Sequence, residues 1–251
     1  MKKTSPSELL VGASTIGGSH LWEGRPNQDA VRVRRYGYGC VAAVADGVGS
    51  QRFSQYGSQA AVQAVHEVFC AYVRGDVRRE HITRTITRWY AQRVKEKYRA
   101  QADTTCLFAA HIYGQGLFLG QIGDGICCGF LNGTPFLLRE KEEEFGNLVV
   151  PLSPGRPTAV WRTRFIPGQQ LRSLELLLAT DGVSGDLLPG KEAAFTRYLM
   201  DRTVGQGQRA GEENLIRLLE NWESPLSLDD KTIALYRCTA ERRKTYEQCC
   251  V

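Results

Sequence analysis

The sequence predicts an α+β fold in which antiparallel strands and amphipathic helices occupy separate stretches of the chain. Short apolar runs bounded by Gly and Pro are typical of strands. Two stretches between residues 54 and 98 instead repeat their apolar residues at helical spacing. The strand-like runs after residue 104 are separated by short turns that contain Gly, which favours antiparallel neighbours.

Length and composition indicate one globular unit. The chain has 251 residues, of which 42% are hydrophobic and 24% charged, so we expect a single domain over residues 1–251 with a core at about residues 9–240. The net charge of +5 is mild and no block of Lys or Arg occurs. This disfavours nucleic acid as a partner.

Cysteine usage and apolar runs indicate the compartment. The eight Cys residues form no CxxC pair, so we interpret them as reduced thiols of a cytoplasmic protein rather than as zinc ligands. The first apolar run is too short for a signal peptide, and no run approaches the length that spans a membrane. We therefore expect no membrane partner.

The first strands are expected at residues 11–16, 30–33 and 38–45. A polar loop, residues 17–29, connects the first two and ends at Asp29. Loops of this length in compact domains often carry function. A functional loop and a plain hairpin connection both remain open for this stretch.

Helices follow the first strands. We expect one helix from Ser54, which can cap its N-terminus, to about Tyr72, and a second helix over residues 80–98. Aromatic residues recur on one side of both segments, which indicates packing against a core rather than a cofactor site.

The second half of the chain returns to strands. Residues 105–113, 117–122 and 126–130 predict an antiparallel meander, and residues 145–158, with three prolines and two glycines, predict an irregular flap or loop. The remaining elements are expected as strands at 160–166, 174–179 and 232–237 and helices at 192–200 and 212–222.

Two apolar runs end in the same way. Residues 41–45 lead into Asp46 and Gly47, and residues 176–179 lead through Thr180 into Asp181 and Gly182. We interpret each run as a buried strand that delivers a carboxylate to its end, where the glycine lets the backbone turn sharply. Carboxylates from distant strands stay ionised at close range only when a hard cation neutralises them. The pattern predicts a metal site.

Five acids stand where a predicted strand meets a turn. In a two-layer sandwich the strand ends of both layers converge on one rim, so these acids could form one oxygen-rich cleft of the kind that magnesium or manganese prefers. Singly, each acid is typical of a turn or a cap. The five are Asp29, Asp46, Asp124, Asp181 and Asp229.

Six motifs, in order along nearly the whole chain, resemble those of the metal-dependent serine/threonine protein phosphatases of type 2C. The resemblance is closest to a bacterial subgroup with an atypical N-terminal motif. Any one motif would be weak evidence, whereas six in the family's order are specific. They are Gln28-Asp29, Ala45-Asp46-Gly47-Val48-Gly49-Ser50, Asp103-Thr104-Thr105, Gly123-Asp124-Gly125, Ala179-Thr180-Asp181-Gly182 and Asp229-Asp230-Lys231-Thr232.

The resemblance implies the fold and the principal ligands. The fold would be a four-layer α-β-β-α sandwich, with two antiparallel sheets face to face and helices flanking each. Asp46 would bridge two metal ions and the Gly47 carbonyl would bind one of them. Asp181 and Asp229 would hold the other side of the site, so that Asp46, Asp181 and Asp229 are the predicted catalytic residues.

The resemblance also implies outer positions of the site. Asp29, and with it Gln28, would act through ordered waters. Asp124 would join Asp181 at a weaker third-metal position. The cofactors would therefore be two Mn²⁺ or Mg²⁺ ions, and binding of a third ion stays open.

The implied activity is hydrolysis of phosphoserine or phosphothreonine on proteins by a water that the two ions activate. The expected partners are phosphorylated proteins modified by a bacterial Hanks-type kinase. Two alternatives stay open: a catalytically inactive module that binds a phosphoprotein, and a phosphatase for small phosphate esters.

This chain departs from the family pattern at several positions. Gly24 stands where many members have an Arg that holds the substrate phosphate, so we predict Arg25 or His20 in that role. Val48 stands where many members have a His that protonates the leaving group, so a metal-bound water or another residue would take over. Gln28 replaces Glu and removes one negative charge near the ions.

Overall fold

The computed structural model describes residues 8–139, 150–156, 158–203, 207–222 and 227–239. The predicted flap at residues 145–158 therefore lies partly outside the described residues. Cys249 and Cys250 lie wholly outside them. Within the described part of the chain, no helix combines the length and hydropathy needed to cross a membrane. The six cysteines at positions 40, 70, 106, 127, 128 and 238 are free thiols, as predicted.

Strands and helices alternate in blocks, as the sequence predicts. The strands are β1 (Glu8–Thr15), β2 (Ala30–Tyr36), β3 (Gly39–Ala45), β4 (Cys106–Ile112), β5 (Gly116–Ile122), β6 (Ile126–Leu131), β7 (Thr134–Arg139), β8 (Arg162–Pro167), β9 (Ser173–Ala179) and β10 (Lys231–Thr239). The α-helices are α1 (Gly18–Glu23), α2 (Ser54–Val73), α3 (Ile82–Arg93), α4 (Asp181–Ser184), α5 (Glu192–Thr203) and α6 (Gln208–Glu220). Short 3₁₀ helices occupy Arg79–His81, Glu96–Gln101 and Gly168–Gln170.

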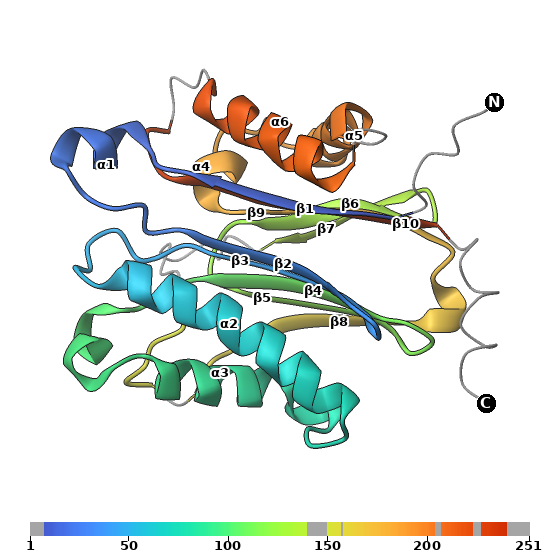
Figure 1. Cartoon of the computed structure of the whole chain (residues 1–251), viewed down its shortest axis with the longest axis horizontal. Coiled ribbons are helices and arrows are strands. Elements are labelled where there is room, and N and C mark those ends of the chain that lie inside the picture. Colours follow the sequence, from blue (N-terminus) through green and yellow to red (C-terminus); the bar gives the residue numbers. More distant parts are fainter. Residues whose placement is uncertain (1–7, 140–149, 157, 204–206, 223–226, 240–251) are drawn as a thin grey trace.

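Two five-stranded antiparallel sheets lie face to face. The β1 sheet has the order β1-β10-β9-β6-β7, and the β2 sheet has the order β2-β3-β4-β5-β8. Helices α5 and α6 cover the outer face of the β1 sheet, and α2 and α3 cover the outer face of the β2 sheet (Figure 1). The four-layer α-β-β-α sandwich is confirmed.

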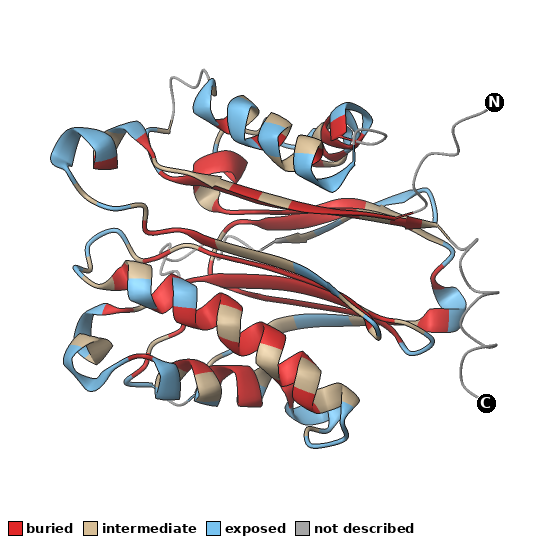
Figure 2. Cartoon of the chain, in the orientation of Figure 1, coloured by how far each residue is buried: buried red, intermediate tan, exposed pale blue. Residues whose placement is uncertain are grey.

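Three apolar layers hold the sandwich together. Leu107, Leu117 and Leu176 belong to the layer between the sheets. Phe69 and Ile86 of the helices pack with the outer face of the β2 sheet, and a third layer joins α5 and α6 to the β1 sheet. All seven residues of β3 are buried because its sheet is covered on both faces (Figure 2). This explains why its sequence is continuously apolar rather than alternating.

The predicted meander of three strands is wrong at its third strand. β4 and β5 pair with each other in the β2 sheet, but β6 pairs with β7 and β9 in the β1 sheet. Both sheets bury an apolar face against the same layer, so the apolar pattern alone does not reveal which sheet a strand joins. The crossing between the sheets carries Asp124 to the rim where they meet.

Several element boundaries also differ from the sequence prediction. The loop over residues 17–29 contains the short helix α1. Strand β7 is not among the predicted strands, because its Pro135 disfavours a strand. Pro is tolerated here because β7 is an edge strand of its sheet. Helix α3 ends at Arg93, short of the predicted residue 98.

The predicted cap of the first long helix is also wrong. Ser54 is the first residue of α2, and Phe53 occupies the cap position without a side-chain cap. The Ser54 hydroxyl instead donates a hydrogen bond to the Gln51 carbonyl, at 3.1 Å.

His66 of α2 is buried between the helix and strand β2. Its Nε2 lies 3.1 Å from the Arg32 carbonyl and its Nδ1 lies 2.9 Å from the Tyr36 hydroxyl. Because a carbonyl only accepts, Nε2 carries the proton and Nδ1 accepts from Tyr36. Burial lowers the pKa of His66 to about 4. The imidazole is therefore neutral in the folded protein.

We predict an acid-sensitive contribution of His66 to stability. Its folded pKa lies below its unfolded value, so its contribution is complete above about pH 6.5 and is lost as the pH falls toward 4. Between pH 7.5 and 4.5 the wild-type protein should lose roughly 2 to 3 kcal/mol more unfolding free energy than His66→Gln, measured by urea denaturation. Exposed His81 provides the control variant His81→Gln, which should follow the wild type. Parallel curves for wild type and His66→Gln would contradict this assignment.

Candidate metal centre

One edge of the sandwich collects the predicted acids. Asp46 follows the last residue of β3, and Asp29 precedes the first residue of β2, which pairs there with β3. In the other sheet Asp181 follows β9, and Asp229 precedes β10, which pairs with that end of β9. Asp124 lies in the crossing between β5 and β6. Antiparallel pairing thus brings all five acids to the same rim.

Three carboxylates form the closest cluster. Asp46, Asp124 and Asp181 each offer an oxygen, and these oxygens lie within 4.8 Å of one another. The cluster joins residues from both sheets and from the crossing between them. Asp124 therefore lies close to Asp46 as well as to Asp181, the only neighbour predicted for it.

The main chain of Asp46 is held by two threonines. The Thr105 amide and the Thr104 hydroxyl both donate to the Asp46 carbonyl, each at 2.7 Å. The Asp46 amide donates to the Thr105 hydroxyl at 3.0 Å. Thr104 and Thr105 are both buried. These bonds fix the end of β3 and so the direction of the Asp46 side chain.

The glycines after Asp46 and Asp181 serve close packing rather than a sharp turn, which corrects the sequence interpretation. Neither Gly47 nor Gly182 is among the glycines with a positive φ. A Cβ at Gly182 would lie 2.0 Å from the Asp230 carbonyl oxygen, and a Cβ at Gly47 would lie 2.8 Å from the Gln28 carbonyl oxygen. Only a residue without a side chain lets these backbones approach.

The carboxylates raise one another's pKa. The pKa of Asp46 lies well above its ordinary value because burial disfavours the charged form and because the charges of Asp29, Asp181 and Asp229 face it. Burial, followed by the charge of Asp229, also raises the pKa of Asp181. These mutual effects place Asp29 and Asp229 beside the three-carboxylate cluster.

The Asp29 carboxyl group combines a raised pKa with an identified hydrogen-bond donor. Burial raises its pKa to about 7, and the charge of Asp230 adds to the rise, while hydrogen bonds from Thr232 and Thr180 oppose it. The Thr180 hydroxyl donates to Asp29 Oδ2 at 2.8 Å. Thr180 immediately precedes Asp181, so one residue positions the acids on both sides of the rim.

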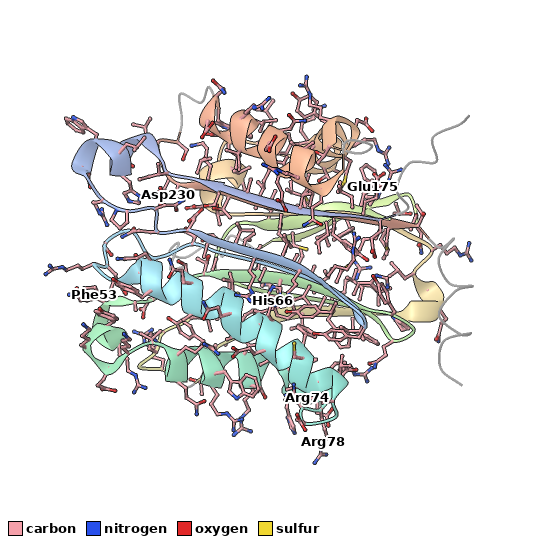
Figure 3. All side chains as sticks on the ribbon, in the orientation of Figure 1. Phe53, His66, Arg74, Arg78, Glu175 and Asp230 are labelled. Atoms are coloured by element: carbon pink, nitrogen blue, oxygen red, sulfur yellow. The ribbon has the colours of Figure 1, made fainter. Side chains whose placement is uncertain are left out.

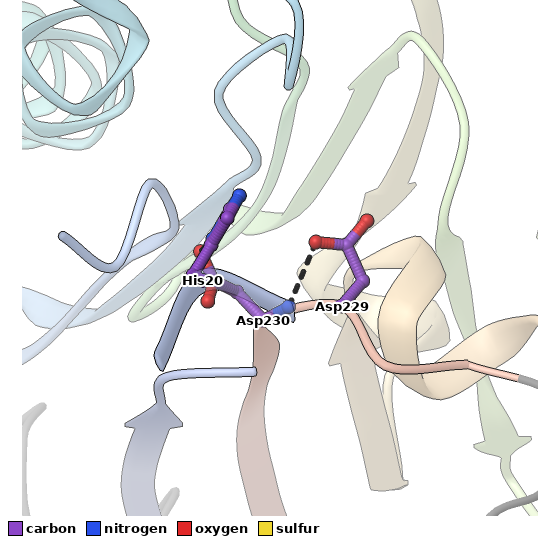
Figure 4. Close-up of side chains that lie close together, drawn as sticks. All are labelled: His20, Asp229 and Asp230. Carbon is purple, nitrogen blue, oxygen red and sulfur yellow. Dashed lines mark hydrogen bonds and ion pairs between the residues drawn. The ribbon is translucent and has the colours of Figure 1, made fainter. Parts of the chain in front are cut away.

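Asp229 and Asp230 are neighbours in sequence with different surroundings (Figure 4). The Asp230 carboxylate is buried and accepts from the Gly17 amide at 2.7 Å and from the Gln28 amide at 2.6 Å. Its Oδ2 also lies 2.9 Å from His20 Nδ1. These three contacts hold the Asp230 carboxylate in place and make it the anchor of the loop over residues 17–28.

The resemblance did not assign Asp230 a role. Its position in an Asp-Asp pair before the last strand was the only signal in the sequence. The partners lie more than two hundred positions away in the chain, so local spacing could not reveal them.

The donor set fits a hard divalent cation. Carboxylate oxygens alone form the cluster of Asp46, Asp124 and Asp181, and magnesium and manganese prefer such ligands. The buried Gln28 Oε1 has no hydrogen-bond partner among the described residues, which leaves a further oxygen beside this loop. The ions would relieve the repulsion that raises the pKa of Asp46.

His20, Asp229 and Asp230 form a second group of potential ligands. Here the histidine and Asp230 bind each other and Asp230 binds two amides. We therefore interpret this group as a structural anchor that leaves Asp229 to face the carboxylate cluster.

The two predicted phosphate-binding residues differ in accessibility. His20 is buried and its Nδ1 is engaged by Asp230. Arg25 is partly exposed, its guanidinium donates to the Gly49 carbonyl at 2.5 Å, and it lies 3.3 Å from Glu23. Gly49 belongs to the segment that follows Asp46, so Arg25 lies near the rim. The phosphate-binding roles themselves stay predictions.

Comparison with known proteins gives a match to one family model and matches to many solved structures of similar fold. The model of the family described as Protein phosphatase 2C matches residues 16–220. No curated protein sequence gives a significant match.

Solved structures with this fold include a bacterial serine phosphatase, at a TM-score of 0.63 and 15% identity, covering 93% of this chain and 98% of that one. The PPM Ser-Thr phosphatase MsPP from Mycobacterium smegmatis, in complex with cacodylate, gives 0.62 and 17%, with 90% and 97% covered. RsbX in complex with magnesium gives 0.55 and 13%, with 94% and 97% covered. At these identities the structures show the shared fold.

We predict that protons and Mn²⁺ compete for this rim. The pKa of Asp29 is raised to about 7 and that of Asp46 is also raised, so a cation must displace protons from this pair of carboxyl groups. Mn²⁺ affinity should therefore rise as the pH increases from 6 to 8 and level off above the pKa of Asp29. Calorimetric titration in two buffers of different ionisation enthalpy should show proton release near pH 7. Affinity that is constant over this range, without proton release, would contradict the assignment.

Proposed function

The chain belongs to the protein phosphatase 2C family, and we propose that it hydrolyses phosphoserine and phosphothreonine on proteins with two divalent metal ions. The observation that carries this proposal is the cluster of Asp46, Asp124 and Asp181, whose oxygens lie within 4.8 Å of one another at the rim of a phosphatase fold. Mn²⁺ and Mg²⁺ are the ions that best suit these ligands.

Asp46 and Asp181 would be the principal ligands, since one comes from each sheet and the two face each other. Asp229 would complete the site, and Asp124 would bind on the side of the crossing. The Gly47 carbonyl is a further proposed ligand. When bound, the ions would lower the pKa of a water toward neutrality and offset the negative charge of the phosphoryl oxygens.

The protein's own groups would position the substrate and hold protons. Arg25 is our preferred phosphate-binding residue because its guanidinium is accessible and is oriented by the Gly49 carbonyl. Asp29, with a pKa of about 7, could hold a proton at its carboxyl group within reach of Asp46. His20 would support the loop through Asp230 rather than bind phosphate directly.

The surface beside the rim has features that would favour binding of a protein substrate. Helix α1 exposes Leu21 and Trp22, which are 63% and 91% exposed, and Leu228 is 67% exposed. The Ser19 amide donates to the Leu228 carbonyl at 3.1 Å, which joins the two segments. Exposed aromatic and aliphatic side chains of this kind are typical of protein contact surfaces.

Kinase partners and location stay proposals. Proteins phosphorylated by a Hanks-type kinase are the proposed substrates on the basis of the sequence resemblance, and a cytoplasmic location rests on the cysteine content. The inactive phosphoprotein-binding module is not favoured, because the chain keeps the three principal carboxylates, Asp46, Asp181 and Asp229.

We predict that phosphate release from a phosphothreonine peptide requires Mn²⁺ and the rim acids. After treatment with EDTA and return of Mn²⁺, wild-type protein should regain activity, whereas Asp46→Asn and Asp181→Asn should fall by more than about a hundredfold. Exposed Asp201 on α5 gives the charge-matched control Asp201→Asn, which should keep wild-type activity. Folded wild-type protein that binds Mn²⁺ but releases no phosphate would overturn the proposal in favour of a binding module.

We also predict that Trp22 contributes to the recognition of protein substrates and not to the hydrolysis of small esters. Trp22→Ser should lower kcat/KM on phosphocasein about tenfold, because an exposed aromatic contact is removed, and should leave hydrolysis of p-nitrophenyl phosphate unchanged. Ile216→Ser, on the surface of α6, serves as the control. An equal loss on both substrates would show that Trp22 acts on the site itself.

A further inference from the structure

A groove with a volume of about 460 Å³ lies between strand β2 and helix α2, away from the rim acids. Strand β2 contributes Arg32, Arg34 and Tyr36, which alternate along the strand and therefore share one face. Figure 3 places His66, another lining residue, beside the middle of α2 and Asp230 at the rim. The groove and the metal centre are separate features.

The groove has an excess of positive charge. Its one acid, Glu67 of α2, is bound by Arg93 of α3 through two contacts, one of them at 2.9 Å. Among the described residues, no carboxylate lies within ion-pair distance of Arg32 or Arg34. The Arg34 guanidinium carbon lies 5.1 Å from the centre of the Tyr36 ring. Within the described part of the chain, these two guanidinium groups therefore lack an acidic partner.

The walls of the groove are fixed by internal contacts. His66 joins the Arg32 carbonyl to the Tyr36 hydroxyl, at 3.1 and 2.9 Å. The Tyr36 ring stacks on Tyr38 with centroids 4.8 Å apart, and the Tyr38 hydroxyl lies 3.0 Å from Cys70 Sγ. A ligand would meet a surface that is already ordered, which lowers the entropic cost of binding.

The position of β2 indicates the shape of the ligand. β2 is one of the two edge strands of its sheet, and β3 is its partner in that sheet. Side chains on one face of a strand repeat at about 6.6 Å, so Arg32 and Arg34 match the alternate residues of a second extended chain. A groove of this volume also exceeds what one carboxylate or phosphate would fill and is within the usual range for larger ligands.

We propose that this groove binds an extended acidic segment of a partner protein. Acids at alternate positions of that segment would pair with Arg32 and Arg34, as opposite charges do across neighbouring strands. Tyr36 would contact the segment beyond the second acid. The proposal does not depend on the phosphatase activity, because the groove contains none of the rim residues.

The test uses a fluorescein-labelled peptide of alternating Thr and Glu, with fluorescence anisotropy as the readout. The full chain should bind this peptide more tightly than a peptide of the same composition whose glutamates are consecutive. The double variant Arg32→Gln/Arg34→Gln should bind it at least about tenfold more weakly. Exposed Arg84 and Arg88 of α3 give the charge-matched control Arg84→Gln/Arg88→Gln, which should bind as the wild type does.

Thermal unfolding followed by circular dichroism checks that both double variants are folded. Should the Arg32 change prevent folding, the single variant Arg34→Gln, at an exposed position, is measured in its place. Binding should also weaken as salt is increased, because the contacts are charged. Equal binding of the two peptides, unchanged binding by the arginine variants, or no binding by the wild type would each overturn the proposal. The last two outcomes would limit the arginines to protecting the edge strand from pairing with other chains.

Discussion

The repulsion among carboxylates at one rim is the constraint on which the rest of the structure depends. Asp46, Asp124 and Asp181 bring oxygens within 4.8 Å of one another, and the charges of Asp29 and Asp229 reach Asp46 as well. Burial makes that arrangement costly without a counter-charge. The surrounding contacts hold it in place, since threonines fix the backbone of Asp46 and orient Asp29. A divalent cation would convert the repulsion into coordination.

The sandwich is well suited to build such a site. Antiparallel pairing places the end of one strand beside the start of the next, and two sheets face to face double the number of ends at the rim. The two adjacent residues Asp229 and Asp230 have different roles at this rim. Asp230 is turned inward to three nitrogen partners and anchors the loop, whereas Asp229 remains beside the cluster.

The sequence predicted the fold class and the rim acids because both leave local patterns in the chain, namely apolar runs bounded by turns and acids where a predicted strand meets a turn. It could not show that β6 changes sheet, because both sheets bury an apolar face against the same layer. It assigned Gly47 and Gly182 to turns, although the packing of distant backbones explains them. The role of Asp230 and the groove beside Arg32 depend on contacts between distant segments, which no spacing in the chain reveals.

The most direct measurement of the central claim is a crystal structure of the protein with Mn²⁺, using anomalous diffraction to locate the ions. We expect two manganese peaks at the rim, both bound to the Asp46 carboxylate, with Asp181 and Asp229 among the other ligands. A folded protein with no manganese at Asp46, or with manganese bound instead by His20 and Asp230, would contradict the assignment of the metal centre.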